Sequence, residues 1–205
     1  MFVKVCGITR AEDAHAAVAA GARALGLVFW PGSPRFIDPF RARAIVRTLP
    51  PFVTPVGLFV DQPLEYIAGV ASLVRLGAVQ LHGAEPVSFA EAVRLPVIKA
   101  LTLGDPIDVW PARVTVLLDA HDPEQHGGTG RTIDWDAAAR VAARRPTILA
   151  GGLTPANVAE AVTRVRPFGI DVSSGVERAP GIKDHGKIDA LFEALHGSSH
   201  VAARS

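Results

Sequence analysis

Two stretches decide the fold: Leu149-Ala-Gly-Gly-Leu-Thr-Pro and Gly169-Ile-Asp-Val-Ser-Ser-Gly-Val-Glu. In each, glycine follows directly after a short apolar run that is typical of a strand. In a barrel of alternating strands and helices, glycine-rich loops after the seventh and eighth strands bring backbone N–H groups and a helix N-terminus around a phosphate. We therefore predict a binding site for a phosphorylated small molecule. Its contacts are expected from Gly151, Gly152, Ser174 and Gly175.

The alternation of short and long segments extends over the whole chain. Short β-branched runs predict eight strands, at residues 3–6, 24–29, 54–60, 78–81, 97–101, 114–119, 147–150 and 168–172. Apolar residues at helical spacing predict six helices between them, within residues 14–21, 42–49, 67–74, 135–142, 158–165 and 188–195. This order predicts an α/β fold, a compact (β/α)8 TIM barrel forming a single domain over residues 1–196.

Three local features refine this prediction. Between the fifth and sixth strands, the glycine and two prolines within residues 102–113 leave room for a turn of helix at most, so the fifth helix is expected to be reduced or absent. Thr154-Pro155 predicts the start of the helix after the seventh strand. Residues 197–205 are expected to be a disordered tail. A doubly wound open sheet is the structural alternative, but no G-x-G-x-x-G follows the first strand.

Composition limits the possible partners. The chain has 205 residues, of which 49% are hydrophobic and 20% charged, as is ordinary for a globular domain. Its formal net charge is only +1 and it has no basic block, so no nucleic-acid partner is expected. Residues 14–30 are apolar but are interrupted by Arg23 and glycines, which excludes a membrane span. A small molecule is the expected partner, and the protein could be a monomer or a homodimer.

The N-terminus and the cysteine content indicate a cytoplasmic protein. A strand-like run follows Met1 directly, without the charged and apolar regions of a secretory signal. The chain has one cysteine, which excludes an intrachain disulfide.

Polar residues stand where the predicted strands end, and the active sites of such barrels lie at the C-terminal ends of the strands. The ring comprises the glycine loops and Cys6, Arg35, Asp61, Gln80, His82 and Asp119. Because side chains alternate along a strand, Lys4 shares a face with Cys6, and Asp171 shares a face with Ser173. A purely structural barrel would place apolar residues there, since an unpaired buried polar atom costs about 1 to 3 kcal/mol. The pattern therefore predicts an active site.

Eight motifs in order resemble the phosphoribosylanthranilate isomerase family. They are KVCGIT (4–9), PGSPR (31–35), VGLFV (56–60), QLHG (80–83), LLD (117–119), GGTG (127–130), LAGGL (149–153) and GIDVSSGVE (169–177). The resemblance extends from residue 3 to about residue 188. It implies an Amadori rearrangement in tryptophan biosynthesis, from N-(5-phosphoribosyl)anthranilate to 1-(2-carboxyphenylamino)-1-deoxyribulose 5-phosphate, without metal or organic cofactor. It also implies that Cys6 is the general base, Asp119 the general acid and Arg35 the contact to the anthranilate carboxylate.

The chemistry of the rearrangement requires the same two groups. An acid must protonate the ring oxygen so that the aminofuranose opens to an imine, and a base must remove the C2 proton so that an enolamine can collapse to the ketose. Cys6 and Asp119, at the ends of the first and sixth strands, are expected to face opposite sides of the sugar.

Each of these residues also has an ordinary structural interpretation. A lone cysteine is usually a small buried hydrophobe, Asp119 could be a turn acceptor, and Arg35 could be a solvated loop charge. The prolines on either side of Ser33 stiffen the Arg35 loop, which favours a bidentate contact to a carboxylate. His82 could be a satisfied core histidine.

Three further residues are expected to contact the substrate: Gln80, His82 and Asp171. Lys4 and Lys99 could form a Schiff base, but an ion pair between Lys4 and Asp171 is the favoured interpretation. No metal site is expected, because the histidines lack H-x-H and H-E-x-x-H spacing and the single cysteine has no thiolate partner.

Two other functions remain open at this point. The first is another phosphosugar barrel enzyme, such as a metal-dependent epimerase, a lysine aldolase or the histidine-pathway isomerase. That isomerase would require an aspartate at the position of Cys6, and an aldolase a lysine at a strand mouth. The second is a silent barrel that only binds phosphate, which would be expected to have lost Cys6 or Asp119.

Overall fold

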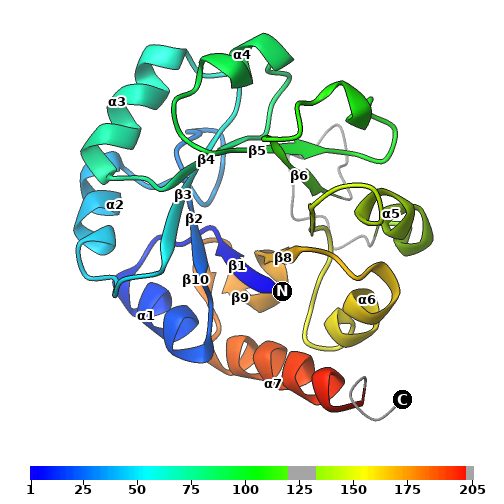
Figure 1. Ribbon diagram of the computed structural model, residues 1–205. Helices are drawn as coiled ribbons and strands as arrows, with labels where there is room; N and C mark the ends of the chain where they lie inside the picture. The colour runs from blue at the N-terminus through cyan, green and yellow to red at the C-terminus, as the bar shows by residue number, and fades with distance from the viewer. Residues whose placement is uncertain (120–132, 202–205) are drawn as a thin grey trace.

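The computed structural model describes residues 1–119 and 133–201 (Figure 1). Eight parallel strands close into a barrel in chain order. They are β1 Phe2–Cys6, β2 Ala24–Val28, β3 Thr54–Phe59, β4 Ala78–Leu81, β5 Val97–Leu101, β6 Thr115–Leu118, β7 Thr147–Leu149 and β8 Gly169–Val172. Every strand end lies within one residue of its predicted position. The prediction of a barrel is confirmed, and the open-sheet alternative is wrong.

Helices surround the barrel on its outside (Figure 1). They are α1 Ala11–Ala20, α2 Pro39–Val46, α3 Leu64–Val74, α4 Val87–Ala92, α5 Trp135–Ala142, α6 Val158–Val165 and α7 His185–Val201. All six predicted helices are present. Helix α4 is not among those six, because it is only six residues long and buries a single residue, Ala90, so it has no apolar repeat. Only the capping-box spacing of Ser88 and Glu91 predicts a helix start here, and α4 begins at Val87. No helix of the described ranges is both long and apolar enough to cross a membrane.

Two helix ends differ from the prediction. Helix α7 continues to Val201, so part of the 197–205 segment expected to be disordered is helical. Its buried apolar series ends at Leu195, which is why the pattern gave no sign of the continuation. Helix α6 begins at Val158, not at Pro155. A turn precedes it, in which Asn157 accepts a hydrogen bond from the Thr154 N–H at 2.8 Å and donates one to the Gly152 carbonyl at 2.9 Å.

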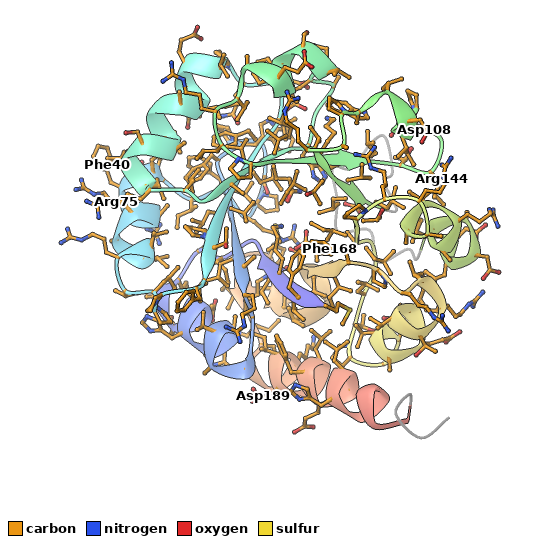
Figure 2. The ribbon with its side chains drawn as sticks, viewed as in Figure 1. Phe40, Arg75, Asp108, Arg144, Phe168 and Asp189 are labelled. Carbon is orange, nitrogen blue, oxygen red and sulfur yellow. The ribbon has the colours of Figure 1, made fainter. Side chains whose placement is uncertain are left out.

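Between β5 and β6 the chain forms only the 3-10 helix η1, Ile107–Val109. The side chain of Arg145, which follows α5, contacts this connection. Its guanidinium donates hydrogen bonds of 2.7 to 3.2 Å to four backbone carbonyls, those of Ile107, Trp110, Pro111 and Val114. In Figure 2 the neighbouring Arg144 lies beside Asp108 of η1, with the charged atoms 3.3 Å apart. Arg145 thus satisfies carbonyls that have no helix around them.

The 3-10 helix η2, Ser174–Val176, follows β8, where the glycine motif predicts a short extra helix. After it comes a short hairpin that was not predicted. The hairpin consists of the antiparallel strands β9, Glu177–Ala179, and β10, Ile182–Lys183. The hairpin packs against the β1–α1 connection: the Lys183 N–H donates to the buried carboxylate of Asp13 at 3.0 Å, and the Thr9 hydroxyl donates to the Gly181 carbonyl. It therefore lies at the end of the barrel where Cys6 ends β1.

Candidate active site

A pocket opens at the C-terminal ends of the strands. All ten predicted site residues line it, namely Cys6, Arg35, Gln80, His82, Asp119, Gly151, Gly152, Asp171, Ser174 and Gly175. Asp61 from the predicted ring does not. Its carboxylate instead accepts the Ala84 N–H at 2.7 Å, so it supports the loop after β4.

Cys6 is the last residue of β1, and its side chain points into the barrel. Val3 and Val5 pack outward against the helices, whereas Cys6 belongs to an inner apolar cluster with Val28 and Leu58. Gly26 lies opposite Cys6 on β2, and a Cβ atom there would come within 2.6 Å of the Cys6 sulfur. Glycine at this position therefore makes room for the thiol.

Burial and charge act in opposite directions on the Cys6 thiol. Burial is the largest influence and raises its pKa, and the Asp171 carboxylate adds to this. The ammonium groups of Lys4 and Lys183 lower the pKa, but by less, so the net direction is upward. The neutral thiol is thus favoured.

The Lys4–Asp171 ion pair predicted from the sequence is present. Lys4 Nζ lies 2.9 Å from both carboxylate oxygens of Asp171, and Lys4 is fully buried. Burial lowers the pKa of Lys4, but Asp171 and Cys6 together outweigh it, so this pKa is raised and the ammonium form is held. Asp171 also lines the pocket, so it can contact a ligand from its paired position.

The two lysines considered for Schiff-base chemistry are both engaged elsewhere. Lys4 is paired with Asp171. Lys99 lies on the outer face of β5 with Val97 and Leu101, which pack against the helices. Its ammonium group lies 2.8 Å from the Glu85 carboxylate and 5.6 Å from the centre of the Trp110 ring. Neither of these two lysines therefore has a free ammonium group at the strand mouth, where an aldolase would require one.

Asp119 follows β6 and lies near a pair of side chains from β4. Its side chain is 15% exposed, and one carboxylate oxygen is 3.7 Å from His82 Nε2. On the other side of the ring, Gln80 Nε2 and His82 Nδ1 are 2.9 Å apart. Because an amide nitrogen can only donate, Nδ1 is the acceptor and a neutral His82 carries its proton on Nε2, the atom that faces Asp119.

Arg35 reaches from the loop after β2 to the hairpin after β8. Arg35 Nε donates to Glu177 Oε1 at 3.0 Å, and Nη2 donates to Oε2 at 2.8 Å. Lys183 Nζ donates to the same Oε1 at 2.8 Å. Glu177 and Lys183 were not predicted as site residues. Glu177 is the last residue of the quoted motif at residues 169–177, and its place in that motif could have indicated a role in the site.

The two glycine loops meet above β7 and β8. Gly151 and Gly152 have φ values of +81° and +62°, in the left-handed region that glycine adopts without strain. At Gly175 a Cβ atom would collide with the carbonyl oxygen of Leu153, so the loops are in direct contact. The motif Gly127-Gly-Thr-Gly lies outside the described residues.

The pocket lining has two chemically different parts. Val28, Leu58, Val60 and the partly buried Trp30 form an apolar wall around Cys6, and Arg35 lines the same pocket. The glycine loops after β7 and β8 form the other part. Such a pocket suits a ligand that carries both an anionic aromatic group and a phosphate.

Known proteins share this chain's sequence and fold. The family model for N-(5'phosphoribosyl)anthranilate (PRA) isomerase matches residues 3–194. The N-(5'-phosphoribosyl)anthranilate isomerase of Pelobacter propionicus is 53% identical over 190 residues, which cover 91% of each chain. The crystal structure of phosphoribosyl anthranilate isomerase from Thermotoga maritima has a TM-score of 0.88 and 45% identity, covering 96% of this chain and 99% of that one. A crystal structure of a phosphoribosyl anthranilate isomerase in complex with reduced 1-(o-carboxyphenylamino)-1-deoxyribulose 5-phosphate has a TM-score of 0.85 and 43% identity. It covers 96% of this chain and 99% of that one. The chain belongs to the N-(5'-phosphoribosyl)anthranilate isomerase family.

Proposed function

We propose that this pocket carries out the isomerase reaction of tryptophan biosynthesis through Cys6 as general base and Asp119 as general acid. The reaction converts N-(5-phosphoribosyl)anthranilate to 1-(2-carboxyphenylamino)-1-deoxyribulose 5-phosphate. The observation that carries the assignment is that a thiol and a carboxylate from separate strands line one pocket together with Arg35 and the glycine loops.

The substrate is proposed to lie across the pocket from the glycine loops to Arg35. Its phosphate accepts hydrogen bonds from backbone N–H groups around Gly152 and Gly175, where the absence of side chains allows close approach. Its aromatic ring rests on the apolar wall that includes Leu58 and Trp30, and its carboxylate binds the guanidinium of Arg35. The sugar then lies between Cys6 and Asp119.

Two proton transfers at the sugar complete the rearrangement. Asp119 protonates the ring oxygen, the bond from C1 to that oxygen breaks, and the nitrogen lone pair forms the imine. Cys6 then acts in its thiolate form, which burial disfavours but the ammonium groups of Lys4 and Lys183 stabilise. The thiolate removes the C2 proton, which gives the enolamine. C1 then takes the proton held by the Cys6 thiol, and the enol hydroxyl gives its proton to the Asp119 carboxylate. Both groups return to their starting states, and the product has the same atoms as the substrate. Since only protons move, no cofactor is needed for these steps.

His82 and Gln80 are proposed to support the acid. Gln80 orients the imidazole through Nδ1, so that Nε2–H points toward Asp119 and the leaving oxygen. Asp171 is proposed to contact a sugar hydroxyl while it remains paired with Lys4. The free thiol that this mechanism requires also supports a cytoplasmic location. Catalytic groups from both ends of the chain support one functional domain over residues 1–196.

The direct test is an activity assay with purified protein. Loss of the fluorescence of N-(5-phosphoribosyl)anthranilate is expected on addition of the enzyme. The substrate of the histidine-pathway isomerase serves as the comparison in a parallel assay. Reaction with that substrate alone would show that the assignment is wrong.

A further inference from the structure

Glu177 is a buried carboxylate beside the pocket that the mechanism above does not use. It is 7% exposed and is the first residue of β9. In addition to its bonds from Arg35 and Lys183, it accepts the Gly181 N–H at 3.2 Å. Burial raises the pKa of Glu177, but Arg35 and Lys183 together outweigh burial and lower it, so the carboxylate is ionised.

The backbone at Gly7 leaves room for the Arg35 side chain to reach this carboxylate. The side chain crosses the β1–α1 connection at Gly7, where a Cβ atom would lie 2.6 Å from Arg35 Cδ. Gly7 also has a φ of +77°, a conformation that other residues adopt only with strain. Arg35 can therefore lie across Gly7 and reach the hairpin.

The hydrogen bonds from Arg35 to Glu177 use one edge of the guanidinium and leave another edge available to a ligand. Glu177 binds the edge formed by Nε and Nη2. Within residues 1–119 and 133–201, Arg35 Nη1 has no hydrogen-bond partner, and the side chain lines the pocket. A planar guanidinium fixed along one edge presents its Nη1 and Nη2 edge in a defined direction, and that edge matches a second carboxylate bidentately.

The charges of the cluster favour the same kind of ligand. With Lys183 in its ammonium form, Arg35 and Lys183 carry two positive charges against the one negative charge of Glu177, which leaves one net positive charge. Burial lowers the pKa of Lys183, and the ion pair with Glu177 opposes this. Lys183 is buried, so its charge faces Glu177 rather than solvent. One carboxylate on the ligand would neutralise the group.

We propose that Glu177 is a positioning residue that holds Arg35 edge-on to the substrate carboxylate and thereby sets the selectivity of the pocket for a carboxylated aromatic ring. This inference rests on the proposed contact between Arg35 and that carboxylate. It differs from a purely structural role of Glu177, in which the carboxylate would only anchor the hairpin through Lys183.

The test measures carboxylate selectivity. Dissociation constants are determined for reduced 1-(o-carboxyphenylamino)-1-deoxyribulose 5-phosphate and for the same compound without the carboxyl group, and their ratio is the selectivity. Arg35→Met is expected to reduce the ratio about 10- to 100-fold, as for a charged hydrogen-bonded contact. Glu177→Gln is expected to reduce it about 10-fold, with the affinity for the carboxyl-free compound unchanged.

Two further variants complete the design. The double variant Arg35→Met, Glu177→Gln should lose no more selectivity than Arg35→Met alone, because Glu177 acts through Arg35. Lys187→Met is the matched control, since Lys187 Nζ donates only to the backbone carbonyl of Glu177, at 2.8 Å. It should keep the wild-type ratio.

The outcomes separate this inference from the proposed function. An unchanged ratio in Arg35→Met would contradict the Arg35 contact itself. A reduced ratio in Arg35→Met with a wild-type ratio in Glu177→Gln would overturn the role of Glu177, and so would additive losses in the double variant.

Glu177→Asp is the alternative variant if Glu177→Gln does not fold. Its carboxylate keeps the charge but is one methylene shorter, so it lies farther from Arg35. A partial loss of selectivity in folded Glu177→Asp supports the role, and a wild-type ratio overturns it.

Discussion

Cys6 is the residue on which the proposed mechanism depends most directly. Removing a general base typically lowers the rate by a factor of about 10² to 10⁴. We expect Cys6→Ala to lose turnover to that extent while it binds the reduced product with nearly wild-type affinity, because the thiol acts in the transition state. Steady-state kinetics and a binding titration of the same preparation check this. Cys6→Ser should also be poor. Retention of more than a tenth of the wild-type kcat in Cys6→Ala would contradict the assignment.

The protonation of Cys6 can be measured separately from catalysis, because it is the only cysteine in the chain. Burial raises the pKa of the thiol in the folded protein, and only the thiolate reacts with an alkylating reagent. The alkylation rate of the folded protein should therefore reach half its maximum at a higher pH than that of the same chain unfolded in urea. Mass spectrometry of timed samples gives both profiles. A lower midpoint in the folded protein would show that Lys4 and Lys183 outweigh burial.

Asp119 is expected to affect turnover more than binding. Asn has the same shape and can still form hydrogen bonds, but it cannot supply the proton that opens the ring. For Asp119→Asn we expect a fall in kcat that is much larger than any rise in KM. Equal effects on kcat and KM would instead indicate that Asp119 only positions the substrate.

At the scale of elements, the connection from β5 to β6 shows how a barrel dispenses with a full helix. Arg145 supplies donors for four carbonyls of this segment. Arg145→Met should lower the free energy of unfolding by about 2 to 4 kcal/mol, because charged hydrogen bonds are lost and the Trp110 and Val114 carbonyls lose their donor. The Ile107 and Pro111 carbonyls keep the backbone N–H groups of Trp110 and Val114 as donors. Arg144→Met is the control. Arg144 is paired with Asp108 on the surface, and such pairs contribute about 1 kcal/mol or less. Chemical denaturation of the two variants should separate them, and similar losses would contradict the role of Arg145.

The strands and the six longer helices could be predicted because each has its own sequence pattern. The strands are short, continuous apolar runs that are buried on both faces, such as β2 and β6. In helices such as α3, apolar residues recur at every third or fourth position. The hairpin of β9 and β10 has strands of only three and two residues, too short for a repeat, and its position depends on contacts with Asp13 and Thr9. The inward direction of Cys6 followed from alternation alone. The partners of Arg35 did not, because hairpin and loop meet only in the folded chain.

At the scale of the whole molecule, the site joins the two ends of the chain. Strands β1 and β8 pair with each other and close the barrel, and the phosphate loops follow β7 and β8. A ligand held by these loops therefore binds the folded chain, in which the barrel is closed, and not the unfolded chain. Its binding shifts the unfolding equilibrium toward the folded state.

We expect inorganic phosphate to stabilise the folded protein, by about 2.7 kcal/mol at a concentration one hundred times its dissociation constant. Thermal unfolding measured against chloride of equal ionic strength isolates specific binding from screening. Gly152→Ala should reduce the increase in Tm caused by phosphate, since the φ of +62° at this position strains any other residue and shifts the loop. Arg35→Met, which alters no residue of the glycine loops, should retain the full increase. If chloride gives the same stabilisation, or if Arg35→Met abolishes it while Gly152→Ala does not, the phosphate does not bind at the glycine loops.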